Sequence, residues 1–307
     1  MENINDVLTK QYRKSDYLLE SEYRKMYDED MTFRKIANEL KLPTETMMKY
    51  TSKIVASSCE LKNCKKCKNL FDCKNEIKGY VYYPQKNDEN IEFCYIPCKY
   101  KLELDEINKY KENIYYFHVP ETLKNANMAS IDITDKNRFE LIKWIKTFLN
   151  NYAVQKPTKG LYLNGSFGCG KTYLLTAMLN ELAKQNHKVA MVYYPEFLRT
   201  LKESFQDGNE FKQIFNHIKK VELLLLDDIG AETLTEWSRD EVLGTILQYR
   251  MEENLKTFFT SNLNIEELEN HLSMTSKDID KVKARRIIER VKQLAEPMTL
   301  ISENKRK

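Results

Sequence analysis

Residues 160–175 read GLYLNGSFGCGKTYLL, which is a short apolar run, a loop with three glycines, a Lys-Thr pair and the start of an apolar-periodic segment. Gly165, any four residues, Gly170, Lys171 and Thr172 match the pattern G-x-x-x-x-G-K-[ST]. This pattern binds phosphate when a strand precedes it and a helix follows, because glycines let backbone N–H groups curl around an anion at a helix N-terminus. The stretch therefore predicts a strand, a phosphate-binding loop and a helix.

The loop also predicts what it binds. The Lys171 ammonium would reach the β- and γ-phosphates of a nucleotide, and the Thr172 hydroxyl would ligate Mg²⁺. A glycine-rich turn without chemistry is the alternative, which the Lys-Thr pair and the flanking segments disfavour. The residues predicted to bind ATP and Mg²⁺ from this loop are Gly165, Ser166, Phe167, Gly168, Cys169, Gly170, Lys171 and Thr172.

Two further apolar runs end in polar side chains. VELLLLDD ends in Asp227 and Asp228, and FFTSN ends in Asn262. Ligand crevices of parallel sheets form at the carboxyl ends of strands, so Asp227 would hold Mg²⁺ through water. Asp228 would polarise the attacking water, and Asn262 would sense the γ-phosphate, so both are predicted catalytic. An acidic turn and a simple turn asparagine are the alternatives.

The second half of the chain alternates short apolar runs with helical periodicity. KVAMVYY, VELLLLDD and TFFTSN are continuous apolar runs of the kind found in strands buried on both faces, and amphipathic segments separate them. The pattern predicts an α/β fold, a P-loop domain with a parallel sheet and helices on both faces.

Composition limits the class of protein. Charged residues make up 31% of the 307, and the net charge of +3 is too small to indicate a nucleic-acid partner by itself. The longest apolar runs fall far short of the ~18 residues of a membrane span, and the start of the chain lacks the apolar core of a signal peptide. We expect a cytoplasmic protein with no membrane partner.

Six of the seven cysteines lie between Cys59 and Cys98, after a segment at 17–52 with helical periodicity. In a reducing compartment this clustering indicates metal before disulfides. Cys64-x-x-Cys67 has the spacing of a zinc knuckle, and a later pair would complete four thiolates around a structural Zn²⁺. The predicted ligands are Cys64, Cys67, Cys94 and Cys98, with Cys73 as the alternative to Cys94. The predicted domains are a small, mainly helical zinc-binding domain at 1–105, a connector at 106–130 and the P-loop domain at 131–307.

With these motifs in order, the second half resembles the AAA+ ATPases, with Walker A at 165–172, Walker B at 223–228 and sensor 1 at Asn262. The run LLLLDDIGAE, the later RRIIERVKQLAEPMTL and the cysteine-bearing helical N-domain resemble the helicase loaders of the DnaC/DnaI group. The resemblance implies that Arg290, in a basic segment at 281–292, is an arginine finger for a neighbouring subunit, hence an ATP-dependent homo-oligomer. Arg285 and Arg286 would serve as sensor or DNA contact, and the helical lid domain is expected to be absent.

The resemblance also implies a function. The N-domain would bind the hexameric replicative DNA helicase, and the AAA+ domain would bind and slowly hydrolyse ATP and contact single-stranded DNA, so that the helicase is loaded during DNA replication. Two alternatives stay open. One is a transposition-helper ATPase, which shares the motifs, and the other is an adaptor that switches with nucleotide but does not hydrolyse it.

Overall fold

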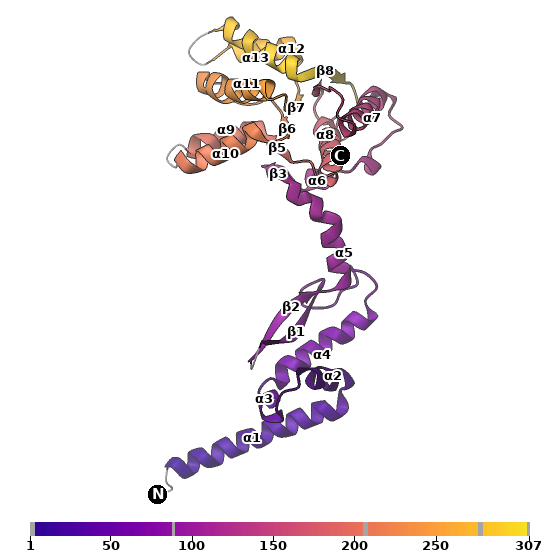
Figure 1. Cartoon of the computed structure of the whole chain (residues 1–307), viewed down its shortest axis with the longest axis vertical. Coiled ribbons are helices and arrows are strands. Elements are labelled where there is room, and N and C mark those ends of the chain that lie inside the picture. The colour runs from indigo at the N-terminus through magenta and orange to yellow at the C-terminus, as the bar shows by residue number, and fades with distance from the viewer. Residues whose placement is uncertain (1–3, 88–89, 205–207, 276–278, 306–307) are drawn as a thin grey trace. The chain divides into compact units, whose positions relative to one another are not determined.

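The computed structural model describes residues 4–87, 90–204, 208–275 and 279–305, and the chain divides into two compact units, residues 1–108 and 109–307. Figure 1 colours the first unit from indigo to magenta and the second from magenta to yellow. In the described residues no helix is both long and apolar enough to cross a membrane. Each unit is described by itself below.

The first unit is built from helices and one hairpin, β1 with β2, in which Val81 pairs with Ile96. Its core is formed by Phe33, Ile36, Met47 and Ile54, with Ile91 from the hairpin packed against them. The elements are α1 (Ile4–Glu29), α2 (Met31–Leu40), α3 (Thr44–Met48), α4 (Thr51–Lys66), β1 (Tyr80–Asn87), β2 (Asn90–Pro97) and α5 (Lys99–Asn108).

Asp30 joins three helices of this unit. Its carboxylate caps the N-terminus of α2 by accepting hydrogen bonds from the backbone N–H groups of Thr32 (2.9 Å) and Phe33 (3.2 Å). The same carboxylate accepts bonds from the Ser58 hydroxyl and the Lys62 ammonium on α4, both at 2.6 Å. A single residue between α1 and α2 thus ties both to α4.

The second unit contains a six-stranded sheet in the order β3-β5-β6-β7-β4-β8, in which every neighbouring pair is parallel. The parallel α/β fold with helices expected from the sequence is therefore confirmed. The strands are β3 (Ile114–Phe117), β4 (Gly160–Gly165), β5 (Val189–Tyr193), β6 (Leu223–Asp227), β7 (Lys256–Ser261) and β8 (Ala295–Leu300).

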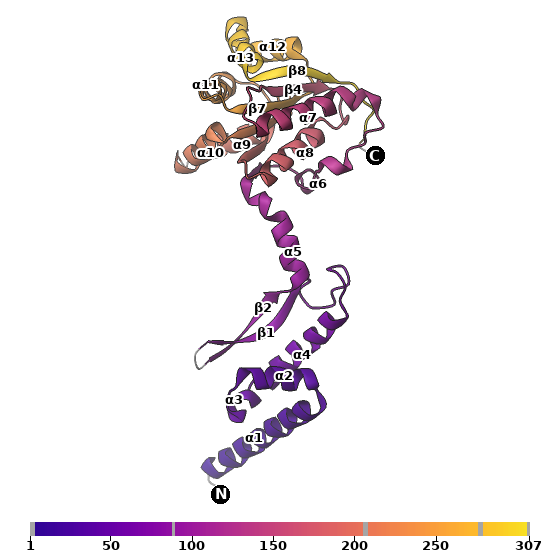
Figure 2. The same cartoon turned by 45° about the vertical axis from the view of Figure 1, so that its right-hand side comes forward.

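Helices cover both faces of this sheet because alternate strand residues point into two separate cores. Leu161, Leu223 and Phe258 pack with α7 and α8, whereas Tyr162 and Leu224 pack with α9 to α13. Figure 2 shows α7 and α8 in front of the strands. The principal helices are α6 (Glu121–Lys124), α7 (Phe139–Ala153), α8 (Lys171–Lys184), α9 (Tyr194–Glu203), α10 (Gly208–Lys220), α11 (Gly244–Glu252), α12 (Ile265–Ser273) and α13 (Lys281–Leu294).

The sequence does not predict four of the strands. The hairpin β1–β2 lies within the cysteine-rich stretch, β8 follows the basic helix α13, and β3 lies in the segment 106–130 that was expected to be a connector. Both β3 and β8 are edge strands, and fewer of their residues are buried than in the strands between them. The apolar runs that reveal central strands are correspondingly weak there.

Candidate nucleotide-binding site

The glycine loop lies between the end of β4 and the start of α8, next to the carboxyl ends of β6 and β7. Leu163 of β4 pairs with Thr260 of β7, and Leu226 of β6 pairs with Phe259, so the loop, Asp227 and Asn262 leave the sheet at the same edge. Three polar segments that are far apart in the sequence therefore meet at one end of the sheet.

Lys171 is the centre of a hydrogen-bonded chain at this edge. Its ammonium donates to the carbonyl oxygens of Gly165 (2.8 Å) and Ser166 (2.9 Å) and to the side-chain oxygen of Asn262 (2.8 Å). The Asn262 amide nitrogen donates in turn to the Asp228 carboxylate at 2.9 Å. The structure thus brings together three of the predicted site residues, Lys171, Asn262 and Asp228.

A second group joins Thr172 to Asp227. The Thr172 hydroxyl donates to the Asp227 carboxylate at 2.6 Å, and the Thr260 hydroxyl donates to the same oxygen at 2.6 Å. The pKa of Asp227 is raised, mainly because the carboxylate is buried. The two hydroxyl bonds lower this pKa, and the neighbouring charge of Asp228 raises it, but neither outweighs burial. A cation at this position would relieve the desolvation of the carboxylate.

The oxygen ligands at this position suit Mg²⁺. Mg²⁺ prefers a few protein oxygens together with water and phosphate oxygens, and the Thr172 hydroxyl at the start of α8 is bonded to the Asp227 carboxylate at the end of β6. Bound there, the ion would neutralise phosphate charge. Thr172 and Asp227 would hold it, and Lys171 would exchange its carbonyl partners for phosphate oxygens.

Asp228 has an unusual backbone conformation. Its φ of 60° lies in the left-handed region, which is uncommon for residues other than glycine and is often found at functional sites. Its N–H donates to the Thr260 hydroxyl at 2.9 Å, and the next residue, Ile229, donates to the Thr260 carbonyl at 2.9 Å. The Thr260 hydroxyl therefore bonds both the Asp227 carboxylate and the Asp228 N–H. The sequence pattern FFTSN does not predict this role.

The glycines of the loop are required by its shape. Gly168 has φ 73° and Gly170 has φ 94°, conformations that strain residues with side chains. A Cβ on Gly168 would also lie 2.0 Å from the side-chain oxygen of Asn304, in the C-terminal segment. Of the other loop residues, Phe167 is exposed and Cys169 is fully buried.

Arg138 and the end of the chain are further partners of the loop that the sequence did not reveal. The Arg138 guanidinium, almost fully buried, donates to the Cys169 carbonyl at 2.8 Å. The Lys305 N–H donates to the Gly168 carbonyl at 2.9 Å. Arg138 lies 31 positions before Cys169, and no local pattern marks either contact.

Arg290 belongs to a different part of the unit. Its guanidinium donates to the Gly244 carbonyl at 2.9 Å, and together with Tyr249 and Glu252 it lines a surface pocket of about 370 Å³ beside α11. The rest of α13 is amphipathic, with Ile287 and Val291 buried. In the same basic segment, Arg285 pairs with Glu269 at 3.2 Å and Arg286 is exposed.

The cysteines of the first unit do not form a metal site in this structure. Among the described residues, no group of three or more Cys, His, Asp or Glu is placed to hold a metal ion. Burial raises the pKa of the Cys64 thiol, and the neighbouring thiols of Cys73, Cys98 and Cys67 raise it further. The Cys94 sulfur lies instead 3.9 Å from the Tyr83 carbonyl oxygen. Zinc stays a prediction, which metal analysis of the purified protein would test.

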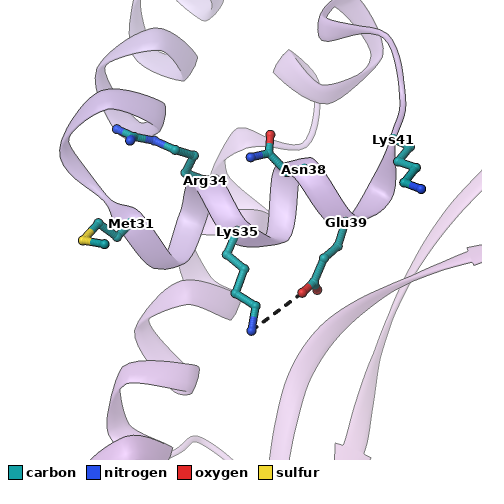
Figure 3. A pocket seen from close by; sticks show the side chains of 6 residues that line it. All are labelled: Met31, Arg34, Lys35, Asn38, Glu39 and Lys41. Carbon is teal, nitrogen blue, oxygen red and sulfur yellow. Dashed lines mark ion pairs between the residues drawn. The ribbon is translucent and has the colours of Figure 1, made fainter.

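The first unit also has a shallow surface pocket of about 440 Å³ along α2. Figure 3 shows Lys35 and Glu39 joined by an ion pair on the pocket wall, with Met31 at one end. Met31 is 82% exposed, whereas Phe33 on the same helix is fully buried. The outward face of α2 is therefore charged with one apolar end.

Comparison with known proteins agrees with the fold and the loop. The IstB-like ATP binding protein family matches residues 124–306, and a crystal structure of DnaI aligns with a TM-score of 0.56 and 42% identity over 64% of this chain and all of that chain. Fold and site together define a P-loop ATP-binding protein of the AAA+ class.

Sequence relatives specify the class further. The replicative helicase loader DnaI of Bacillus subtilis is 37% identical over 92% of this chain and 90% of its own length. The replicative helicase loader DnaC of Escherichia coli K12 is 27% identical over 34% of this chain and 43% of its own length. The chain belongs to the IstB-like ATP-binding family and to the family of the replicative helicase loader DnaI.

Proposed function

We propose that this protein loads the replicative DNA helicase onto single-stranded DNA and that it hydrolyses ATP in the process. The ATPase part rests on one observation, the two hydrogen bonds that connect Lys171 through Asn262 to Asp228. The helicase part is supported by the similarity to DnaI over 92% of the chain, a share that must take in most of the first unit. Such a protein acts in the cytoplasm.

Hydrolysis needs a group that orients water opposite the γ-phosphate. In the proposed site Lys171 would bind the β- and γ-phosphates, and Asp227 and Thr172 would hold Mg²⁺. Asp228 accepts a proton from the attacking water, and Asn262 bonds both Lys171 and Asp228, so it links the phosphate-binding group to the base. A γ-phosphate would compete with Asn262 for the Lys171 ammonium, which makes Asn262 a sensor of its presence.

Arg290 would act on a second copy of the chain. Its guanidinium is held by the Gly244 carbonyl in a pocket beside α11, among residues other than those of the phosphate loop. An arginine has the fixed charge and planar geometry that stabilise a transferring phosphoryl group. We therefore propose ATP-dependent assembly, in which Arg290 completes the site of a neighbouring subunit.

The first unit would bind the helicase, and the second would contact single-stranded DNA. Arg285 and Arg286 on the exposed face of α13 supply positive charge for a phosphate backbone. A transposition-helper ATPase has no better support, because the similarity to DnaI extends through the first unit. A nucleotide-switched adaptor without hydrolysis would have no use for the arrangement around Asp228.

The test uses the full chain with the replicative helicase of the same organism. ATP turnover and the amount of helicase retained on single-stranded circular DNA are measured for the wild type and for Asp228→Asn. We expect wild-type loading and turnover, and at least a tenfold loss of turnover with retained ATP binding in the variant. Equal turnover in the two proteins would remove the base assignment, and no helicase retention by the wild type would remove the loader function.

A further inference from the structure

The last described residues of the chain lie against the phosphate loop. After β8 the chain runs to the loop, where the Ser302 carbonyl accepts a bond from the Ser166 hydroxyl (3.5 Å) and the Lys305 N–H donates to the Gly168 carbonyl (2.9 Å). We call residues 302–305 the strap. Asn304 lies so close to Gly168 that a Cβ there would meet its side-chain oxygen at 2.0 Å.

Side chains before α7 hold the strap in place. Ser302 is 9% exposed, and its hydroxyl donates to the Asp135 carboxylate at 2.6 Å. The Lys305 ammonium lies 3.3 Å from the Asp132 carboxylate. The pKa of the Asp135 carboxyl is lowered, mainly because its carboxylate accepts this hydrogen bond from Ser302. The strap is therefore attached at both ends to the segment that leads into α7.

The same segment supplies Arg138, which contacts the loop directly. Its guanidinium donates to the Cys169 carbonyl, lies 3.5 Å from Asp135, and comes within 3.1 Å of the position of a Cβ on Gly170. Two successive carbonyls of the loop, those of Gly168 and Cys169, are thus bound by Lys305 and Arg138.

Holding these carbonyls determines where the N–H groups point. In a trans peptide the C=O of one residue and the N–H of the next point in opposite directions, and the described chain contains no cis peptide bond. The N–H of Cys169 consequently points away from the Lys305 N–H, and the N–H of Gly170 points away from the Arg138 guanidinium. Successive backbone N–H groups of such a loop form the cradle for phosphate.

We propose that the strap, together with Arg138, preorganises the phosphate loop for nucleotide, so that the C-terminal segment is a working part of the ATP site. Preorganisation raises affinity because the loop need not lose conformational freedom when the nucleotide binds. This inference rests on the proposed ATP site. It predicts that ATP binding weakens when either of two contacts outside every nucleotide motif is lost, the bond from the Lys305 N–H to Gly168 or the bond from the Ser302 hydroxyl to Asp135.

A matched pair at residue 305 separates the backbone bond from the side chain. Lys305→Pro removes the N–H that donates to Gly168, whereas Lys305→Ala keeps it and loses only the exposed ion pair with Asp132. Affinity of the full chain for fluorescently labelled ATP is measured by titration. We expect a loss of about three- to tenfold for proline and at most twofold for alanine, because one hydrogen bond is worth roughly that factor.

A second variant removes the strap's attachment without proline. Ser302→Ala should also weaken ATP binding and speed hydrogen exchange at the amides of 165–172, whereas Glu303→Ala, an exposed neighbour, should leave both unchanged. If Lys305→Pro and Ser302→Ala bind ATP as tightly as Lys305→Ala and Glu303→Ala do, the strap has no role. If the wild type itself binds no ATP, the proposed site fails, which is a different result.

Discussion

At the residue scale, Asn262 and Lys171 show how a nucleotide would change this site. The Lys171 ammonium is bound by two loop carbonyls and by Asn262, so every one of these bonds competes with a phosphate. Binding of ATP would therefore free the Asn262 side-chain oxygen from Lys171, while the Asn262 amide nitrogen keeps its bond to Asp228. The predicted residues Thr172 and Asp227 likewise bond each other where Mg²⁺ would separate them.

Lys171→Ala should abolish nucleotide binding, since it removes the only side-chain cation that the loop contributes to the β- and γ-phosphates. Lys184→Ala, at the exposed end of the same helix, is the matched control and should bind ATP normally. Calorimetric titration with ATP and Mg²⁺ measures both. Unchanged affinity in Lys171→Ala would contradict the site.

Asp30 predicts a pH-dependent stability of the first unit. Burial would raise its pKa, but the bonds from Lys62, Ser58 and two backbone N–H groups lower it from 3.8 to about 2. Because the folded-state pKa lies below the unfolded one, the carboxylate stabilises the fold above about pH 4. That contribution is lost as the pH falls toward 2.

Asp30→Asn should therefore lower the free energy of unfolding by about 2 kcal/mol at pH 7. The difference from wild type should shrink between pH 4 and 2. Urea unfolding followed by circular dichroism measures both proteins, and Glu29→Gln, the exposed neighbour, should cost little. A difference that persists unchanged at pH 2 would mean that the charge of Asp30 contributes nothing.

At the element scale, Arg250 holds together the amino ends of the central strands. Its buried guanidinium bonds the carbonyls of Lys219, Val221, Glu222 and Lys256 and the Thr257 hydroxyl, which joins α10, β6 and β7 to α11. These bonds lie at the amino ends of the strands, and the nucleotide motifs lie at the carboxyl ends. This arginine is structural, although the sequence offers it as one more basic residue on a helix.

Arg250→Met keeps most of the side-chain volume but leaves those carbonyls without their donor, so we expect a loss of about 3 kcal/mol or more in the second unit. Arg199→Met, an exposed arginine on α9, is the control and should cost less than about 0.5 kcal/mol. Thermal unfolding measures both. A loss below about 1 kcal/mol in Arg250→Met would show that water replaces the guanidinium.

At the scale of the whole molecule, the two units have separate cores. The core of the first unit uses residues between 23 and 93, and the two cores of the second use residues between 110 and 300. Each unit therefore has the buried apolar surface to fold alone. The proposed division, with helicase binding by the first unit and ATP binding by the second, can be tested by separating the units.

Residues 1–108 and residues 109–307, expressed as separate proteins, should each fold. The fragment 109–307 is expected to bind ATP with the affinity of the full chain and to lose the helicase, and the fragment 1–108 should retain the helicase in a pull-down. The full chain and Lys171→Ala are the controls for the two measurements. Retention of the helicase by 109–307 alone would contradict the assignment of helicase binding to the first unit.

The sequence by itself determined the phosphate loop, the central strands and the order of the site residues, because these depend on local patterns. A buried parallel strand is a continuous apolar run, and a phosphate loop needs glycines and a lysine at set positions. The same local information predicted that Asp228 and Asn262 would meet near Lys171, since carboxyl ends of parallel strands share one edge.

Only the tertiary structure showed the edge strands of the sheet and the contacts that hold the site residues in place. It made β3 and β8 strands, assigned Thr260 to both acids, placed Cys94 beside Tyr83, and brought Arg138 and the strap to the loop. These contacts join residues that are distant in the chain, and most are made by backbone carbonyls, which every residue carries. Because every residue carries a backbone carbonyl, the sequence does not indicate which donor binds a given carbonyl, and only the folded structure shows it.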